Sequence, residues 1–232
     1  MSIIENINNL RNKISVTEKR FKRRKSSVSL LAVSKTRSIE TIIAAISQGQ
    51  LHFGENYCQE AVAKIEAINN PNLIWHFIGP IQSNKTKQIS SYFDWVHTID
   101  RIKIARLLNE QRPMNLTPLN VCIQINISYE NSKSGITLDN VDGFIRELEQ
   151  FKRLKVRGLM SLPAPVSSFD EQRIPFSILK RKLQELKMSR PGIDTLSIGT
   201  SEDMTAAIAE GATIVRIGTA LFGPRNVRKH TS

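Results

Sequence analysis

The sequence has little cysteine and no long apolar run, and these absences exclude several classes of protein. Only two of its 232 residues are cysteines, so we expect no disulfide framework, and a reducing cytoplasm suits the chain. No stretch reaches the roughly 20 apolar residues of a membrane-spanning helix. Residues 2–11 mix Glu5 and asparagines into their apolar positions, which a secretory signal peptide would not do.

The sequence also lacks zinc-ligand spacing, an aromatic RNA-binding signature and repeats of 20–50 residues. Its net charge of +12 would attract either nucleic acid or a phosphorylated small molecule. The densest basic run, residues 19–25, is interrupted only by Phe21. We interpret this run as a solvated surface segment and expect no nucleic-acid or membrane partner, with a basic nucleic-acid-binding module as a rival hypothesis.

Short apolar runs alternate with helical stripes along the chain. Residues 29–34 form the first run, and Ile39, Ile42, Ile43 and Ile46 follow with helical spacing before Gly49. The same reasoning predicts seven further strands, at residues 51–53, 73–78, 93–98, 119–127, 156–160, 195–198 and 214–217. It predicts the helices between them at residues 57–68, 85–91, 104–108, 141–148, 176–186 and 202–210.

Eight strands, most of them followed by a helix, favour a closed barrel. Parallel strands require crossover connections, and helices must cover the sheet. We therefore predict an α/β fold, a single (β/α)₈ TIM-type barrel domain over residues 1–232, close to the roughly 250 residues typical of this fold. An extra N-terminal helix, with Ile3, Ile7, Leu10 and Ile14 on one side, is expected to pack against the barrel. A doubly wound open sheet is the alternative.

Two predicted strand ends suggest a phosphate site. Gly199 permits close approach of the backbone, and Ser201 is a natural N-cap for the helix expected after the seventh strand. Gly218 and Thr219 follow the eighth strand. Each segment alone fits a routine capped turn or glycine loop. Because barrels commonly bind phosphate with the loops after strands seven and eight, the two together predict a phosphate ligand.

A lysine and an arginine stand at the same predicted end of the barrel. Lys35 ends the first strand, where poor solvation would lower the pKa of its amine and make it nucleophilic; the alternative is a lysine that extends to solvent. A lysine beside a phosphate site suits a phosphorylated aldehyde, and pyridoxal 5′-phosphate (PLP) is such a ligand. Arg216 either faces the pyridine nitrogen or forms a salt bridge to an acid such as Glu55 or Asp203.

The sequence resembles the pyridoxal phosphate homeostasis protein family, the YggS/PROSC-type proteins, which are similar to the barrel domain of alanine racemase. The resemblance covers roughly residues 25–225 and is carried by AVSKT (32–36), HFGENY (52–57), WHFIGPIQSNK (75–85), FDWVHTIDR (93–101), the run from 119 to NSKSGI (ending at 136), RGLMSLPAP (157–165) and SEDMTAAIAEGATIVRIGTALFG (201–223).

The resemblance implies a set of cofactor-binding residues and no catalytic or metal-binding ones. It implies that Lys35 forms a Schiff base with PLP and that Arg216 lies near the pyridine nitrogen. The remaining contacts that it implies are Asn56 beside the ring and Ser201, Gly218 and Thr219 on the phosphate. The family often has Met-Gly-Met-Ser where this sequence has IGTS at residues 198–201, so we expect an altered wall beside the ring and an intact backbone cradle.

A carrier is favoured over an enzyme. Racemisation needs an acid and a base on opposite faces, and we expect none of Tyr57, Tyr92 and Tyr129 to stand inside the cradle. Alanine racemase adds a second domain after its barrel, whereas this sequence continues for only nine residues after Gly223. We therefore expect a cytoplasmic, monomeric, non-catalytic PLP carrier, with PLP-dependent apo-enzymes as candidate partners. A small amino-acid racemase is the alternative.

The remaining polar candidates on the strands are read as structural. The three histidines there, His52, His76 and His97, share no metal-ligand spacing and are expected to be core or barrel-wall residues. Glu55 is either a general base or a hydrogen-bonding support for the neighbouring loop.

Overall fold

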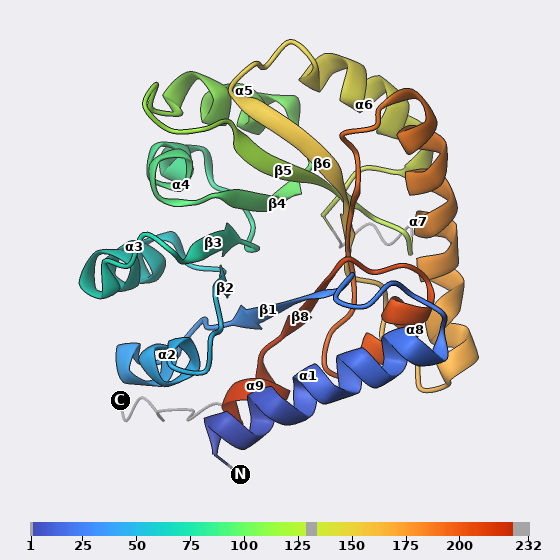
Figure 1. Ribbon diagram of the computed structural model, residues 1–232. Coiled ribbons are helices and arrows are strands. Elements are labelled where there is room, and N and C mark those ends of the chain that lie inside the picture. Colours follow the sequence, from blue (N-terminus) through green and yellow to red (C-terminus); the bar gives the residue numbers. More distant parts are fainter. Residues whose placement is uncertain (1, 129–133, 225–232) are drawn as a thin grey trace, which may run out of the picture.

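The computed structural model describes residues 2–128 and 134–224, and it has the predicted closed barrel of eight parallel strands (Figure 1). Each strand pairs with the next in sequence order, and the last strand pairs with the first, with Leu31 opposite Arg216. This closing pair excludes the open doubly wound sheet. The strands are β1 (Ser29–Val33), β2 (His52–Glu55), β3 (Ile74–Phe77), β4 (Trp95–Ile99), β5 (Leu119–Ile125), β6 (Leu154–Ser161), β7 (Thr195–Ser197) and β8 (Ile214–Ile217).

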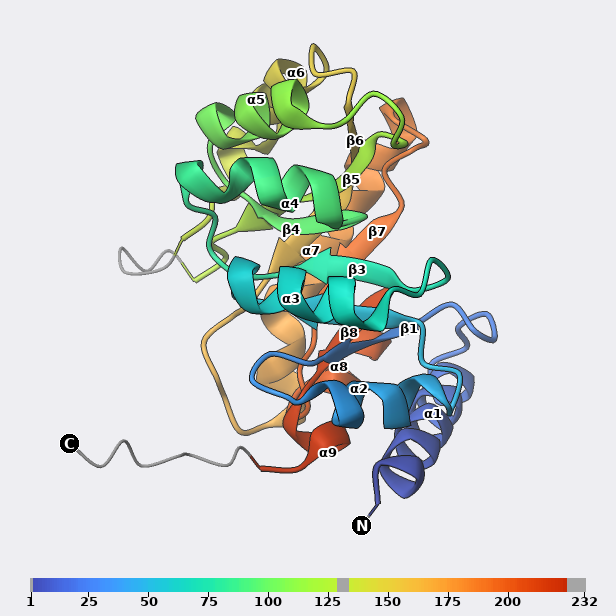
Figure 2. The same cartoon turned by 90° about the vertical axis from the view of Figure 1, so that its left-hand side faces the viewer.

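Helices cover the outside of the barrel, and Figure 2 shows α2 to α5 side by side over one flank. The helices that follow β1 to β7 are α2 (Ile39–Ile46), α3 (Cys58–Ile68), α4 (Thr86–Tyr92), α5 (Ile102–Gln111), α6 (Val141–Leu148), α7 (Phe169–Ser189) and α8 (Met204–Ala209). Single 3₁₀ turns precede α4 at Ser83–Lys85 and α6 at Leu138–Asn140. A short helix after β8, α9 (Thr219–Phe222), was not predicted because four residues are too few to show a periodic pattern.

One predicted helical stripe is partly wrong. In α2 the buried residues are Ile42 and Ala45, whereas Ile43 is 51% exposed. The buried face is rotated from the centre of the isoleucine stripe toward Ala45, which leaves Ile43 on the solvent side. An apolar stripe therefore located the helix but not its exact inner face.

The extra N-terminal helix, α1 (Ile3–Arg20), lies along the flank of the barrel against α8 and α9 (Figure 1). Ser2 and Glu5 form a capping box at its start, and Ile7, Leu10 and Ile14 are buried as predicted. The basic run of residues 19–25, which begins in the last turn of α1, is exposed apart from Phe21 and Arg23. The Arg23 guanidinium donates to the carbonyls of Ile208 in α8 and of Ala212 in the turn after it, so this one cation has a structural role.

The two cysteines are buried free thiols, in agreement with the absence of a disulfide framework. Cys122 is a core residue on β5, and burial raises the pKa of its thiol to about 12. Within residues 2–128 and 134–224, no helix is both long enough and apolar enough to cross a membrane.

A buried ion pair ties the ends of β1 and β2 to α3. The Glu55 side chain is fully buried, and its Oε1 accepts hydrogen bonds from Ser34 Oγ at 2.6 Å and Lys64 Nζ at 2.8 Å. Lys64 Nζ also donates to the Ser34 carbonyl at 2.8 Å and lies 2.5 Å from Glu60 Oε1. Glu60 in turn accepts from the Thr36 N–H at 2.6 Å. These bonds fix the turn after β1, and they show Glu55 in the supporting role.

We expect Lys64→Met to destabilise the barrel, and to do so more at neutral than at acidic pH. Burial raises the pKa of Glu55 and Lys64 counteracts it, so the variant would raise this pKa further. A buried carboxylate without its partner costs about 3–5 kcal/mol at pH 7. The deficit should shrink as pH falls through the raised pKa, because the protonated acid needs no cation. Urea unfolding at neutral and mildly acidic pH measures this, with exposed Lys87→Met as the control. A pH-independent deficit would contradict the argument.

Candidate functional site

A cavity of about 990 Å³ opens at the carboxyl ends of the barrel strands. Its walls come from the turns and loops after most of the strands, as expected for a barrel of this type. The structure brings all the residues predicted to bind a cofactor to this one cavity: Lys35, Asn56, Ser201, Arg216, Gly218 and Thr219. Their common location follows from the fold, whereas the role of each remains a prediction.

Lys35 lies in the turn directly after β1 and is half-buried. The next residue, Thr36, has a left-handed backbone with φ of +63°, which a β-branched residue rarely adopts. The hydrogen bond from the Thr36 N–H to Glu60 holds this conformation in place. The sharp turn directs the chain away from the strand, and its lysine lines the cavity, as do Val33 and Ile78.

Arg216 is 7% exposed and is held entirely by neutral acceptors. Its Nη1 donates to the Ser197 carbonyl at 2.5 Å and to Ser197 Oγ at 2.9 Å, and its Nη2 donates to the Ser161 carbonyl at 2.9 Å. Burial lowers the pKa of Arg216 to about 10, so the side chain stays cationic at neutral pH. It forms no ion pair with Glu55 or Asp203 in the described part of the chain, which rules out the salt-bridge alternative.

The cradle after β8 presents backbone donors. Gly218 precedes α9, and the N–H groups of Thr219 and Ala220 open this helix, so they have no acceptor within it. Both residues line the cavity. A helix start with unused N–H groups is suited to an anion.

The cradle after β7 differs in one detail from the prediction. Ser201 lies in a turn that lines the cavity, but it is not an N-cap, because α8 begins only at Met204. Asp203 Oδ1 accepts from the N–H of Thr200 at 2.5 Å and from its hydroxyl at 2.8 Å, which adds an extra turn before the helix. The predicted need for glycine at 199 holds, since φ is +94° and a Cβ would lie 2.6 Å from that of Ala207.

Asn56 follows β2 and carries a side-chain oxygen that is buried without a hydrogen-bond partner among the described residues. A buried polar atom without a partner destabilises the fold unless a ligand or a water molecule forms a hydrogen bond to it. The backbone of Gly79 packs against the backbone of Asn56, because a Cβ at residue 79 would lie 2.2 Å from the backbone carbonyl oxygen of Asn56. Asn56 lines the cavity, so its side-chain oxygen is available to accept a hydrogen bond there.

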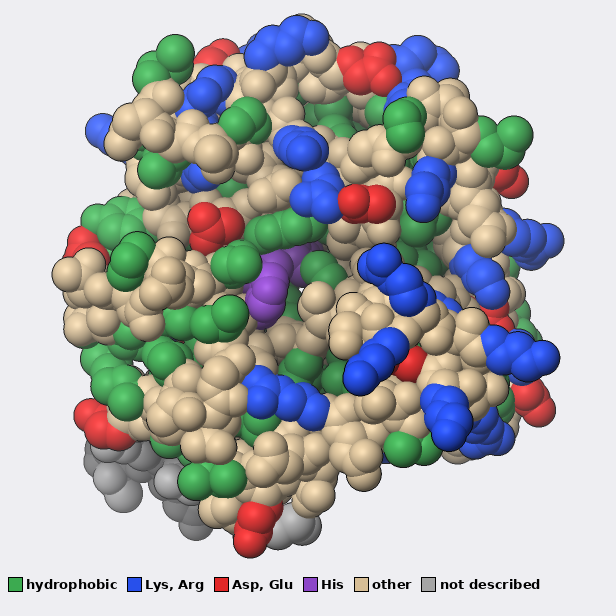
Figure 3. Space-filling view, viewed as in Figure 1, with side chains coloured by type: hydrophobic (Ala, Val, Ile, Leu, Met, Phe, Trp, Pro, Cys, Tyr) green, Lys and Arg blue, Asp and Glu red, His purple; other side chains and the backbone are tan. Residues whose placement is uncertain are grey.

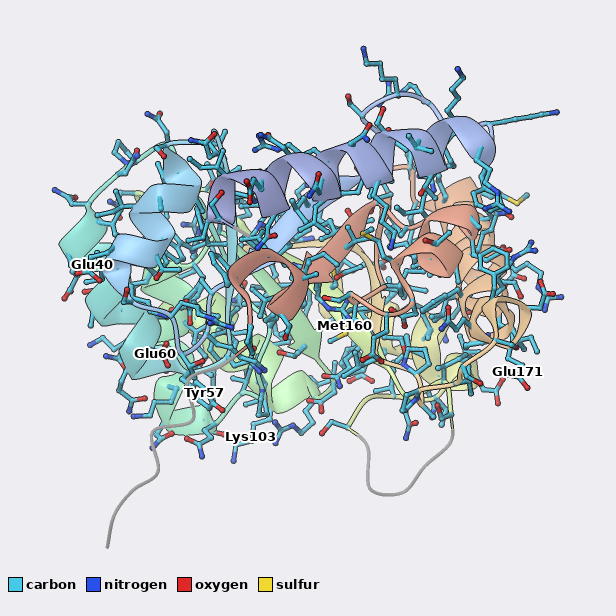
Figure 4. All side chains as sticks on the ribbon, turned by 90° about the horizontal axis from the view of Figure 1, so that it is seen from below. Glu40, Tyr57, Glu60, Lys103, Met160 and Glu171 are labelled. Carbon is cyan, nitrogen blue, oxygen red and sulfur yellow. The ribbon has the colours of Figure 1, made fainter. Side chains whose placement is uncertain are left out.

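No tyrosine lines the cavity among the residues that the structure describes. Tyr57 follows Asn56 but is 55% exposed, and Figure 4 shows it toward the outside near α3, away from Met160 at the cavity. Tyr92 donates to Glu66 on the surface. Tyr129 and residues 131–133 of the NSKSGI motif lie outside the described residues, as does His230.

Three further cavity residues had no binding role predicted for them: Thr98 and Met160, which were expected only at strand ends, and Gln124, which was not found from the sequence. They stand at the inward-facing ends of strands, but nothing in their local pattern separates them from core positions. The histidines on the strands were predicted as core or wall residues, and His76 and His97 are indeed buried. No cluster of three or more His, Cys, Asp or Glu side chains in the described ranges could hold a metal ion.

Residues 6–226 match the family described as the alanine racemase N-terminal domain. The pyridoxal phosphate homeostasis protein of Escherichia coli (strain K12) is 50% identical over 230 residues, which cover 98% of each chain. The protein of the same name from Haemophilus influenzae is 49% identical over 230 residues, which cover 97% of each chain.

The solved structures agree with this assignment. PipY of Synechococcus elongatus PCC7942, solved with PLP bound, has a TM-score of 0.82 at 32% identity and covers 96% of this chain and 100% of its own. Alanine racemase from Corynebacterium glutamicum has a TM-score of 0.71 at 16% identity over 96% of this chain and 61% of its own, so it shares the fold. The chain therefore belongs to the pyridoxal phosphate homeostasis protein family, whose barrel is that of the alanine racemase N-terminal domain.

Proposed function

We propose that this protein binds PLP in the cavity as a Schiff base on Lys35 and serves cofactor homeostasis rather than catalysis. One observation carries the proposal: a lysine, a buried arginine and a helix start with unused N–H groups line the same cavity. The printed names of the relatives agree with it, since they concern PLP homeostasis and a PLP-bound structure.

The cavity residues fit each part of this ligand. The Lys35 amine matches the aldehyde, and the backbone N–H groups of Thr219 and Ala220 match the phosphate. The hydroxyls of Ser201 and Thr219 add donors on the same side. The Asn56 side-chain oxygen, which has no hydrogen-bond partner among the described residues, suits a polar substituent of the ring. The net charge of +12 also favours an anionic ligand.

The chain's own residues explain why binding would not lead to strong catalysis. When bound, PLP supplies an electrophilic aldehyde and an electron-withdrawing ring. The Lys35 amine would serve as the nucleophile for that aldehyde in a condensation that releases one water and is reversible. Arg216 only donates hydrogen bonds, so it cannot take a proton from the ring nitrogen or keep that nitrogen protonated. No described tyrosine stands ready as a second acid or base.

A homeostatic role follows from reversible capture. The protein would limit free aldehyde and release it to PLP-dependent apo-enzymes, acting as a cytoplasmic monomer. The second candidate is a small amino-acid racemase. The similarity of the barrel to alanine racemase favours this racemase hypothesis. The cavity has no tyrosine among its described lining residues, which argues against the racemase.

Incubation with PLP should give a visible absorbance band in the parent protein and none in Lys35→Ala. Borohydride should then reduce the imine and place the added mass on the peptide that contains Lys35. Lys103→Ala is the matched control, because this lysine is exposed on α5 and does not line the cavity (Figure 4). A parent without the band, or an adduct on another lysine, would refute the proposed site.

Ser201→Ala and Thr219→Val should each weaken PLP binding but leave binding of pyridoxal, which lacks the phosphate, unchanged. A hydrogen bond to a charged group contributes about 1.5–3 kcal/mol, and about 1.4 kcal/mol is a tenfold change in affinity. We therefore expect at least a roughly tenfold loss for PLP, measured by absorbance titration. Equal losses for the two ligands would mean that these hydroxyls do not contact the phosphate.

The PLP-loaded protein should not exchange the α-hydrogen of L-alanine or racemise it faster than the same concentration of free PLP. Arg216 leaves the ring a weak electron sink, and no second proton-transfer residue is in place. Proton NMR in D₂O follows the exchange directly. Turnover that disappears in Lys35→Ala would instead establish the racemase.

A further inference from the structure

Three histidines form a hydrogen-bonded column that ends at the arginine of the cavity. His52 Nδ1 lies 3.0 Å from His76 Nε2, and His76 Nδ1 lies 2.9 Å from His97 Nε2. His97 Nδ1 lies 2.8 Å from Ser197 Oγ, which accepts a hydrogen bond from Arg216 Nη1. We call these three imidazoles the histidine column.

The histidine column runs through the inside of the barrel. Its members stand on the neighbouring strands β2, β3 and β4, and His97 reaches across to Ser197 on β7, which does not border β4. His52 is the first residue of β2 and lines a smaller cavity of about 350 Å³ near α1. Figure 3 shows histidine at the bottom of the central hollow on the face seen there.

Barrel interiors are normally filled by branched apolar side chains, so a column of imidazoles calls for an explanation. Each buried ring nitrogen costs free energy unless it has a partner. Here both ring nitrogens of His76 and both of His97 have a hydrogen-bond partner. The hydrogen-bonded path runs from His52 to Ser197. A complete path of this kind indicates a role at its inner end.

Hydrogen-bond logic gives the column one direction. Arg216 can only donate, so Ser197 Oγ accepts from it. In the described part of the chain, His97 Nδ1 is the one acceptor for the Ser197 hydroxyl hydrogen. His97 must then carry its own hydrogen on Nε2 and donate to His76 Nδ1, and His76 must likewise donate from Nε2 to His52.

The buried imidazoles are neutral, as this arrangement requires. Burial lowers the pKa of His97 to about 3, and the nearby Arg216 charge acts in the same direction. Burial also holds the pKa of His76 well below its usual value. Each ring therefore offers one donor and one acceptor over the neutral range.

We propose that His97, backed by His76 and His52, is a positioning residue that orients the Ser197 hydroxyl and so holds Arg216 in place against the ring of the bound cofactor. This inference rests on the proposed PLP function. It extends the functional unit from the cavity at one end of the barrel to His52 near the other. Without His97, the Ser197 hydroxyl loses its acceptor and the guanidinium loses one fixed contact.

Three variants separate positioning from packing. His97→Leu removes the acceptor, whereas His97→Asn keeps a side-chain oxygen close to the place of Nδ1. Val96→Ala is the control on the same strand, since neighbouring side chains on a strand face opposite sides and Val96 faces the helices. Urea unfolding reports how much each change affects the barrel itself.

Two readouts decide the inference. In the protein without ligand, long-range ¹H–¹⁵N NMR should find the hydrogen on Nε2 of both His97 and His76. With PLP, His97→Leu should bind roughly tenfold more weakly and shift the absorbance maximum, because one fixed contact of a charged group is lost. His97→Asn should restore both affinity and absorbance, and Val96→Ala should match the parent even if it is less stable.

The outcomes are distinguishable. A hydrogen on Nδ1 of His97, or a His97→Leu variant with the affinity and absorbance of the parent, overturns the positioning role and leaves the PLP function intact. A His97→Asn variant as impaired as His97→Leu also overturns it. A parent that forms no absorbance band refutes the proposed function, and this inference falls with it.

Discussion

Pairing between the first and last strands is the interaction on which the rest of the structure depends. It places Leu31 opposite Arg216 and Ala32 opposite Ile217. Lys35 on one side and Gly218 on the other therefore meet at the same end of the barrel, although about 180 residues of chain separate them. The cavity exists because this parallel pair closes the sheet.

The two buried charges beside this closed sheet have different kinds of partner. Glu55 is offset by Lys64 behind the turn that carries Lys35, so the lysine backbone has a fixed support. Arg216 has only carbonyl and hydroxyl partners, so its positive charge is held without being neutralised. A buried cation without a direct ion-pair partner creates a permanent electric field in the cavity beside it, because the surroundings screen it poorly.

Strands and strand ends could be predicted from the sequence because they depend on local patterns. The strand predicted at residues 214–217 has the bounds of β8, and every residue predicted to bind the cofactor lines the cavity. Features that depend on contacts between residues far apart in the sequence could not be predicted. The N-cap of α8 is Asp203 rather than Ser201 because an extra turn precedes the helix. The hydrogen bonds among His52, His76 and His97 depend on the register of three strands, and the hydrophobic pattern of the sequence does not determine that register.

The helix that begins the chain braces the elements that end the fold. Asn6 donates to the Leu221 carbonyl of α9 at 2.9 Å, and Arg23 donates to one carbonyl in α8 and to one in the turn that follows it. During synthesis on the ribosome, α1 and β1 emerge long before their partners exist. The barrel can close only after β8 and α9 have left the exit tunnel, so an interrupted chain would lack a complete cavity. The protein would therefore bind its ligand only after the whole barrel has been synthesised.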